Sequence, residues 1–128
     1  TRQAERSEVV NPSGTEGLDI ITCGPIPPNP AETLGSQMME KLIGEMKNHY
    51  DIIIFDASPV LSVTDAQIIS NKCDGTVLVL SAGDTEKASI AKAKEALVSS
   101  QAKIIGVVLN NFELDKDHYY YQYYGNGE

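Results

Sequence analysis

The apolar residues of this chain gather into short runs that alternate with segments of helical periodicity. Four runs stand out, at residues 18–22, 51–56, 75–80 and 103–109. The last three are nearly continuous in apolar residues, and they lack the polar alternation of a half-exposed strand. A run of this kind is typical of a strand that is covered on both faces, as in a parallel sheet.

The segments between the runs carry helix signals. Asn29 is positioned as an N-cap, Pro30 suits the first helical position, and Glu32 can reach back to the cap. An apolar stripe with helical spacing follows and predicts one helix; it consists of Leu34, Met38, Leu42 and Met46.

Two further helices are expected after the second apolar run. Thr64 with Gln67 three residues later predicts a capped helix over 65–71. Thr85 can cap another helix, in which small alanines mix with lysines that form a solvent face. Strands and helices then alternate along the chain, which predicts an α/β fold with a mostly parallel sheet flanked by helices. Ligands of such a sheet are expected at the carboxyl ends of its strands.

The two ends of the chain differ from this pattern. Residues 1–17 are polar and contain a turn signal at 11–14, so an exposed lead-in with one short helix is expected. The whole chain has 128 residues and is 41% hydrophobic, which suffices for one core. We therefore assign residues 1–117 to a single α/β domain and residues 118–128 to a flexible tail.

The bulk composition narrows the possible partners. The net charge of −8 and the pI of about 4.6 argue against nucleic acid or an anionic membrane as a direct partner, because phosphate binding needs clustered Lys and Arg. No apolar run approaches the ~20 residues that span a bilayer. Cys23 and Cys73 lie far apart without Cys or His neighbours at metal-ligand spacing, so neither a disulfide framework nor a zinc site is indicated.

Three residues at predicted element ends could carry chemistry. Asp56 ends an apolar run, where a carboxylate could reach a metal-bound phosphate, although a turn-forming aspartate fits the pattern equally well. Asp65 lies in a first helical turn, where the helix dipole favours an acid in any case. Asn110 ends the last run and offers both a donor and an acceptor, which suits an adenine edge or a turn. His49 and His118 have no evident partner and receive no role.

The tail is the most unusual segment. It holds five of the six tyrosines, namely Tyr119, Tyr120, Tyr121, Tyr123 and Tyr124. Their clustering matches neither a strand nor a helix period. A segment that stacks on a neighbour and a set of phosphate acceptors are both compatible with it.

Several segments in succession resemble the cytoplasmic kinase domain of bacterial tyrosine kinases that serve capsule and exopolysaccharide production. They are GPIPPNPAE at 24–32, DIIIFD at 51–56, VTDAQ at 63–67, GVVLN at 106–110 and the tyrosine tail. The proline-rich segment and the tail are the specific parts. The apolar run that ends in Asp56 is shared with the wider family of MinD- and ParA-like P-loop ATPases.

The resemblance implies roles for these residues. Asp56 would be the Walker B acid that holds Mg²⁺ through water, and Asn110 would lie near the adenine of ATP. The five tail tyrosines would be autophosphorylation acceptors, presented to a neighbouring subunit in a ring. The implied partners are other kinase subunits, a membrane polysaccharide co-polymerase or activator, and a cognate phosphatase. The implied location is cytoplasmic, at the inner face of the membrane, where a partner or a membrane segment of the protein would hold the kinase.

One departure from the family is large. Family members carry a G-x-x-x-x-G-K-[ST] phosphate loop ahead of the matching region, and this sequence has no Gly-Lys dipeptide. The resemblance therefore implies a P-loop NTPase-like fold that is incomplete at its N-terminus, and ATP is not expected to bind this chain tightly by itself. A smaller departure is Ala57-Ser58 after Asp56, where family members often have a hydroxyl followed by two prolines.

Two other functional classes stay open at this point. The chain could be a non-catalytic phosphoacceptor or interaction module that depends on another chain for its phosphate loop. It could also be a fragment of a MinD- or ParA-type ATPase, although that class gives no reason for the tyrosines.

Overall fold

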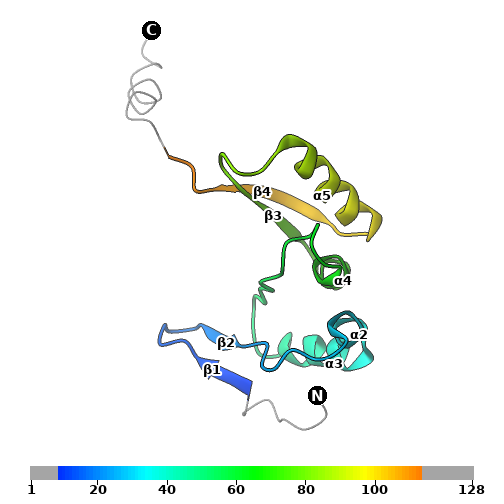
Figure 1. The fold of residues 1–128 in the computed structure, drawn as a ribbon. Helices are drawn as coiled ribbons and strands as arrows, with labels where there is room; N and C mark the ends of the chain where they lie inside the picture. Colours follow the sequence, from blue (N-terminus) through cyan, green and yellow to red (C-terminus); the bar gives the residue numbers. More distant parts are fainter. Residues whose placement is uncertain (1–8, 114–128) are drawn as a thin grey trace. The chain divides into compact units, whose positions relative to one another are not determined.

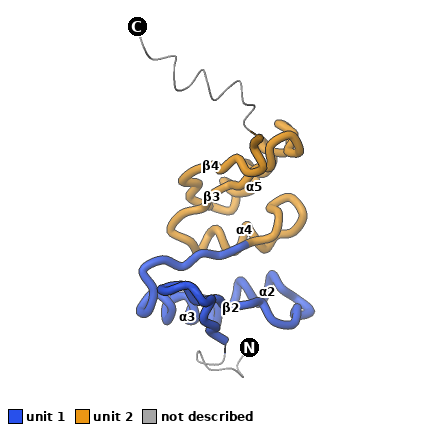
Figure 2. Tube along the Cα trace, turned by 90° about the vertical axis from the view of Figure 1, so that its left-hand side faces the viewer, with its two compact units in different colours: residues 1–56 blue, residues 57–128 orange. Residues whose placement is uncertain are grey.

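The computed structural model describes residues 9–113. The chain divides into two compact units, Thr1–Asp56 and Ala57–Glu128 (Figure 2). The boundary separates the segment that carries Asp56 from the segment that carries Asn110.

The described part of the first unit contains a short antiparallel hairpin. Its strands are β1 (Val10–Pro12) and β2 (Asp19–Ile21), with Asn11 opposite Ile20. Ser13 N donates to Leu18 O at 3.2 Å across the connecting turn. The strand predicted at 18–22 is thus confirmed, whereas the polar lead-in contributes a strand that the sequence pattern did not predict. The helix expected before the turn falls largely outside the described residues.

Two helices follow, where the apolar stripe predicted one (Figure 1). They are α2 (Pro30–Gly35) and α3 (Gln37–Met46), and Ser36 between them has an extended backbone with ψ 155°. The Ser36 hydroxyl donates to Thr33 O at 2.7 Å and accepts from Met39 N at 3.3 Å. Serine is among the strongest N-cap residues and glycine is a poor helix former, so Gly35-Ser36 ends one helix and starts another.

The start of α2 also differs in detail from the expectation. Asn29 is its N-cap and Pro30 its first residue, as predicted, but the Asn29 side chain makes no cap hydrogen bond to the backbone. Instead, its amide donates to Glu32 Oε2 at 3.1 Å. The two side chains therefore pair with each other rather than with the backbone N–H groups at the start of α2.

The segment 51–56 is not a strand in the structure. It runs without regular secondary structure, and Ile52 and Ile54 are 77% and 86% exposed. A strand requires a neighbouring backbone as hydrogen-bond partner, and among residues 9–113 the sheets contain only the pairs β1–β2 and β3–β4. The prediction of a buried strand here is wrong for this chain, although the residue types are those of a strand.

The second unit contains a parallel pair of strands with a helical crossover (Figure 1). Its elements are α4 (Asp65–Lys72), β3 (Thr76–Ser81), α5 (Lys87–Ser99) and β4 (Ile104–Asn110). Strands β3 and β4 pair in parallel from Thr76 opposite Ile104 to Ser81 opposite Asn110. This β–α–β arrangement confirms the predicted α/β class.

The core of the second unit lies where α4 and α5 meet. Ala93 and Leu97 of α5 and Ser70 of α4 are buried, and Asn71 Nδ2 donates to Ser100 O at 2.9 Å between the ends of the two helices. Gly75, just before β3, lies so close to Ile105 that an added Cβ would be 2.8 Å from the Ile105 Cδ1 atom. Glycine is needed there for a steric reason rather than a conformational one.

Within residues 9–113 the β3–β4 sheet is not fully covered, in contrast to the expectation from its apolar runs. Large apolar residues of both strands are exposed, namely Val77, Val79, Ile105, Val107, Val108 and Leu109. We call these six residues the exposed sheet residues.

The helix predicted at 65–71 is confirmed as α4 with Thr64 at its N-cap, but neither threonine predicted to cap a helix in this unit makes a cap hydrogen bond. Thr64 precedes α4 but makes no side-chain cap bond, and the Gln67 amide donates weakly to Val60 O at 3.4 Å. The N-cap of α5 is Glu86, because the Thr85 hydroxyl accepts from Ser81 N at 3.0 Å and closes the turn after β3. Every helix within residues 9–113 is too short or too polar to span a bilayer.

Candidate functional site

The carboxyl ends of β3 and β4 form a polar edge. Asn110 is the last residue of β4, as predicted, and its side chain is exposed. Its carbonyl accepts from Ala82 N at 2.9 Å, which joins it to the chain just beyond β3. Ligands of open parallel sheets bind outside these ends, so Asn110 lies where a nucleotide base could be contacted.

A chain of side-chain hydrogen bonds runs next to Asn110. Asn111 Nδ2 donates to Ser81 Oγ at 3.1 Å, and Ser81 Oγ donates to Asp84 Oδ2 at 3.0 Å. We call Ser81, Asp84 and Asn111 the latch. Sequence reasoning missed all three, although a polar cluster directly after a strand and an Asn-Asn pair are recognisable turn signals.

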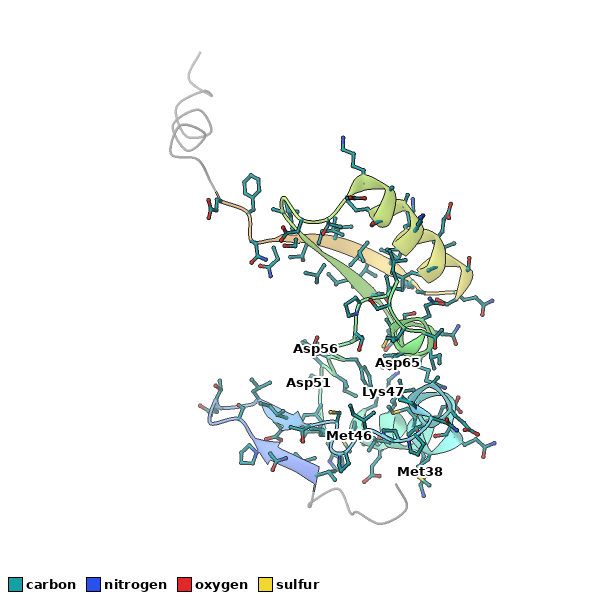
Figure 3. All side chains as sticks on the ribbon, in the orientation of Figure 1. Met38, Met46, Lys47, Asp51, Asp56 and Asp65 are labelled. Carbon is teal, nitrogen blue, oxygen red and sulfur yellow. The ribbon has the colours of Figure 1, made fainter. Side chains whose placement is uncertain are left out.

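Asp56 lies on the irregular segment that follows α3, together with Asp51 (Figure 3). Its carboxylate is exposed. The sequence predicts Asp56 at the carboxyl end of a strand, where ligands of a parallel sheet bind. Because the segment is not a strand in this structure, Asp56 does not occupy such a position. The residue still presents a solvated carboxylate, and carboxylates commonly bind Mg²⁺ through a coordinated water.

Asp65 is the first residue of α4 and is half-buried (Figure 3). This is the position in which the helix dipole stabilises an acid. Asp65 needs no further role to explain its presence.

A direct metal centre is not found in the described part of the chain. Within residues 9–113, no three His, Cys, Asp or Glu side chains lie close enough to hold an ion. A magnesium contact through water at Asp56 requires only one carboxylate, so the donor chemistry fits that weaker arrangement. Cys23 and Cys73 form no disulfide with another described residue, and both Cys23 and His49 are exposed.

The five tail tyrosines and His118 lie outside the described residues. The sixth tyrosine, Tyr50, is half-buried, and its hydroxyl donates to Asp19 Oδ2 at 2.6 Å. A short hydrogen bond to a carboxylate ties up the atom that a kinase would phosphorylate. Tyr50 is therefore a structural tyrosine of the first unit.

No model of a known protein family matches the chain. It is 48% identical over 124 residues to the tyrosine-protein kinase YwqD of Bacillus subtilis, across 97% of this chain and 52% of that protein. It is 39% identical over 119 residues to the putative tyrosine-protein kinase CapB of Staphylococcus aureus, across 93% of this chain and 52% of that protein.

Solved structures, including a tyrosine kinase domain, also resemble this chain. The chimerical protein CapA2B2 matches with a TM-score of 0.84 and 34% identity, over 88% of this chain and 50% of that one. The kinase domain of Escherichia coli tyrosine kinase ETK matches with a TM-score of 0.81 and 30% identity, over 88% of this chain and 45% of that one. The chain thus spans about half the length of the relatives that it matches.

Proposed function

Because this chain belongs to the family of bacterial tyrosine kinases and corresponds to part of their kinase domain, we propose that it contributes to an ATP-dependent protein-tyrosine kinase that phosphorylates its own tail. The observation that carries the proposal is 48% identity to a tyrosine-protein kinase across nearly the whole chain. The acceptors are Tyr119, Tyr120, Tyr121, Tyr123 and Tyr124. The kinase regulates capsular or exopolysaccharide synthesis.

Two residues of the chain have proposed roles at the nucleotide. Asp56 orients Mg²⁺ through a coordinated water, and Asn110 contacts the adenine of ATP. A kinase also needs a phosphate cradle of converging N–H groups with a lysine, and this sequence contains no Gly-Lys dipeptide. Activity is therefore assigned to the assembled kinase and not to this chain by itself.

The partners follow from the same proposal. A neighbouring kinase subunit receives the tail in a ring, a membrane co-polymerase or activator docks the kinase at the inner face of the membrane, and a phosphatase removes the phosphates. Each phosphotyrosine adds about −1.5 to −2 charges, so several on one acidic chain repel acidic neighbours and loosen the assembly.

The test mixes the chain with the B. subtilis relative YwqD, ATP and Mg²⁺, and mass spectrometry locates the phosphate. Phosphate on residues 119–124 and none on Tyr50 is the expected result, because the Tyr50 hydroxyl is engaged with Asp19. The matched control replaces the five tail tyrosines with phenylalanine and should abolish labelling of the chain. Labelling mainly at Tyr50, or none in the tail, would reject the tail as the acceptor.

A second arm separates the kinase from a non-catalytic acceptor module. In what we call the hybrid kinase, this chain replaces the matching residues of YwqD. Autophosphorylation of the hybrid kinase is expected if the chain supplies working catalytic residues. A folded hybrid that stays inactive while the chain is labelled by intact YwqD would identify it as an acceptor module only.

A further inference from the structure

The backbone around Asn110 is fixed on one side by the strand pairing. Asn110 lies opposite Ser81 in the β3–β4 register, and its carbonyl accepts from Ala82 N at 2.9 Å. The turn beyond β3 is itself closed, since Thr85 N donates to Ser81 O at 3.0 Å and Ser81 N donates to Thr85 Oγ1 at 3.0 Å. These two hydrogen bonds therefore fix the backbone of Ser81 at the turn that follows β3.

On its other side, Asn110 is followed by an unusual backbone. Asn111 has φ 56°, in the left-handed region. For an L-residue other than glycine this conformation brings Cβ close to the following carbonyl oxygen and is disfavoured, and asparagine tolerates it best when its short side chain finds a local hydrogen bond. Here the partner is Ser81 Oγ, at 3.1 Å from Asn111 Nδ2, and Asp84 Oδ2 orients that hydroxyl by accepting its hydrogen bond at 3.0 Å.

The latch thus holds Asn111 in a conformation that turns the chain directly after Asn110. The backbone on both sides of Asn110 is then fixed. The β3–β4 pairing fixes the residues before it, and the hydrogen bond to the Ser81 side chain fixes Asn111 after it. The Asn110 amide itself is exposed. A side chain on a fixed backbone loses less conformational entropy when it binds a ligand than one on a mobile loop.

We propose that Ser81, Asp84 and Asn111 are positioning residues that preorganise Asn110 for the edge of an adenine base. The inference rests on the proposed base contact of Asn110. An amide presents a donor and an acceptor side by side, and the adenine edge presents the complementary pair, whereas guanine carries two acceptors at the corresponding major-groove edge. The latch accordingly governs both the affinity for ATP and the preference for ATP over GTP.

The first experiment measures steady-state autophosphorylation of the hybrid kinase with ATP and GTP. Asn111→Gly keeps the left-handed backbone accessible and removes the amide, and Ser81→Ala removes the bridging hydroxyl. Each is expected to raise the KM for ATP about three- to tenfold, the effect of one hydrogen bond, while kcat stays within about twofold and the preference for ATP falls. Asn110→Ala should have a larger effect of the same kind.

A matched control is Asn71→Ala, which removes another asparagine hydrogen bond between two elements of the same unit, the one to Ser100 O. It should lower the melting temperature without changing the KM for ATP. If Ser81→Ala and Asn111→Gly behave like Asn71→Ala, the latch is a structural turn lock and the inference is wrong, even when Asn110→Ala raises KM. If Asn110→Ala also leaves the KM for ATP unchanged, Asn110 does not contact the base, and both the proposed base contact and the latch proposal are wrong.

A second readout uses the chain itself and no activity. The Asn110 side-chain amide signal is followed by NMR during titration with adenosine or guanosine, which carry no phosphate and so need no phosphate cradle. Adenosine is expected to shift this signal more than guanosine does, and Asn111→Gly is expected to weaken the shift. Equal shifts for the two nucleosides, or a shift that is unchanged by both latch substitutions, would overturn the proposal.

Discussion

At the scale of single residues, Asp56 has the largest predicted effect on activity. Asp56→Asn preserves shape and hydrogen-bonding capacity but removes the charge that favours Mg²⁺. In the hybrid kinase, phosphate transfer should fall by about a hundredfold or more, equivalent to about 3 kcal/mol of transition-state stabilisation. Steady-state autophosphorylation measures the loss, and thermal melting controls for folding, which an exposed side chain should barely affect.

If Asp56 only forms a turn, asparagine serves nearly as well and activity survives. Normal turnover at normal stability would therefore remove Asp56 from the active site.

Thr76 offers a prediction about stability at the same scale. Its Oγ1 is buried and finds no hydrogen-bond partner among the described residues. Thr76→Val replaces the hydroxyl by a methyl of similar size at a strand position, so the free energy of unfolding should rise by about 0.5–1.5 kcal/mol. Urea denaturation of the chain measures it.

Thr85→Val is the matched control, because its hydroxyl accepts from Ser81 N. The same chemical change there should destabilise the chain. Equal effects of the two substitutions would show that the Thr76 hydroxyl is satisfied, for example by water.

At the scale of elements, Ser36 separates α2 from α3. Its hydroxyl accepts from Met39 N at the start of α3 and donates to Thr33 O at the end of α2. Ser36→Ala should lower the free energy of unfolding by about 0.5–2 kcal/mol, the range measured for N-cap serines. Ser99→Ala, at an exposed position at the end of α5, should change it little.

The helix content of the Ser36→Ala variant tests whether Ser36 causes the break between α2 and α3. If α2 and α3 fuse into one helix when Ser36 is replaced, far-ultraviolet circular dichroism will show more helix together with unchanged stability. That outcome would contradict the cap as the cause of the break.

At the scale of the whole molecule, the apolar surface of the chain dominates its expected behaviour. The exposed sheet residues are six large apolar side chains, and Ile52 and Ile54 add more apolar surface in the other unit. Contiguous apolar surface and unpaired strand edges favour association. The isolated chain should self-associate at micromolar concentration, as measured by light scattering.

Val79→Lys places a charge among the exposed sheet residues and should reduce association. Val98→Lys adds the same charge at an exposed position on α5 and serves as the control. Equal effects of the two would assign the change to net charge, and a monomeric unmodified chain would contradict the prediction outright.

The elements that the sequence predicted well are those with local causes. Proline at the first position of α2, the strand residues of β3 and β4, and Asn110 at the end of β4 follow from propensities and periodicities within a few residues. The relation to tyrosine kinases rests likewise on the order of residues along the chain. The predictions that failed concern side chains with a choice of partner: Thr85 closes a turn instead of capping α5, and Asn29 pairs with Glu32.

Residue order by itself therefore determined the family and the β–α–β order of the second unit, because these depend on chemistry carried by neighbouring positions. Tertiary structure decided the rest. Segment 51–56 has the residues of a strand, but no strand within residues 9–113 pairs with it, and hydrogen-bonded pairing is a property of two segments rather than one. The latch forms for the converse reason: Ser81 and Asn111 are 30 positions apart in sequence, and only the parallel pairing of β3 with β4 brings their side chains within hydrogen-bonding distance.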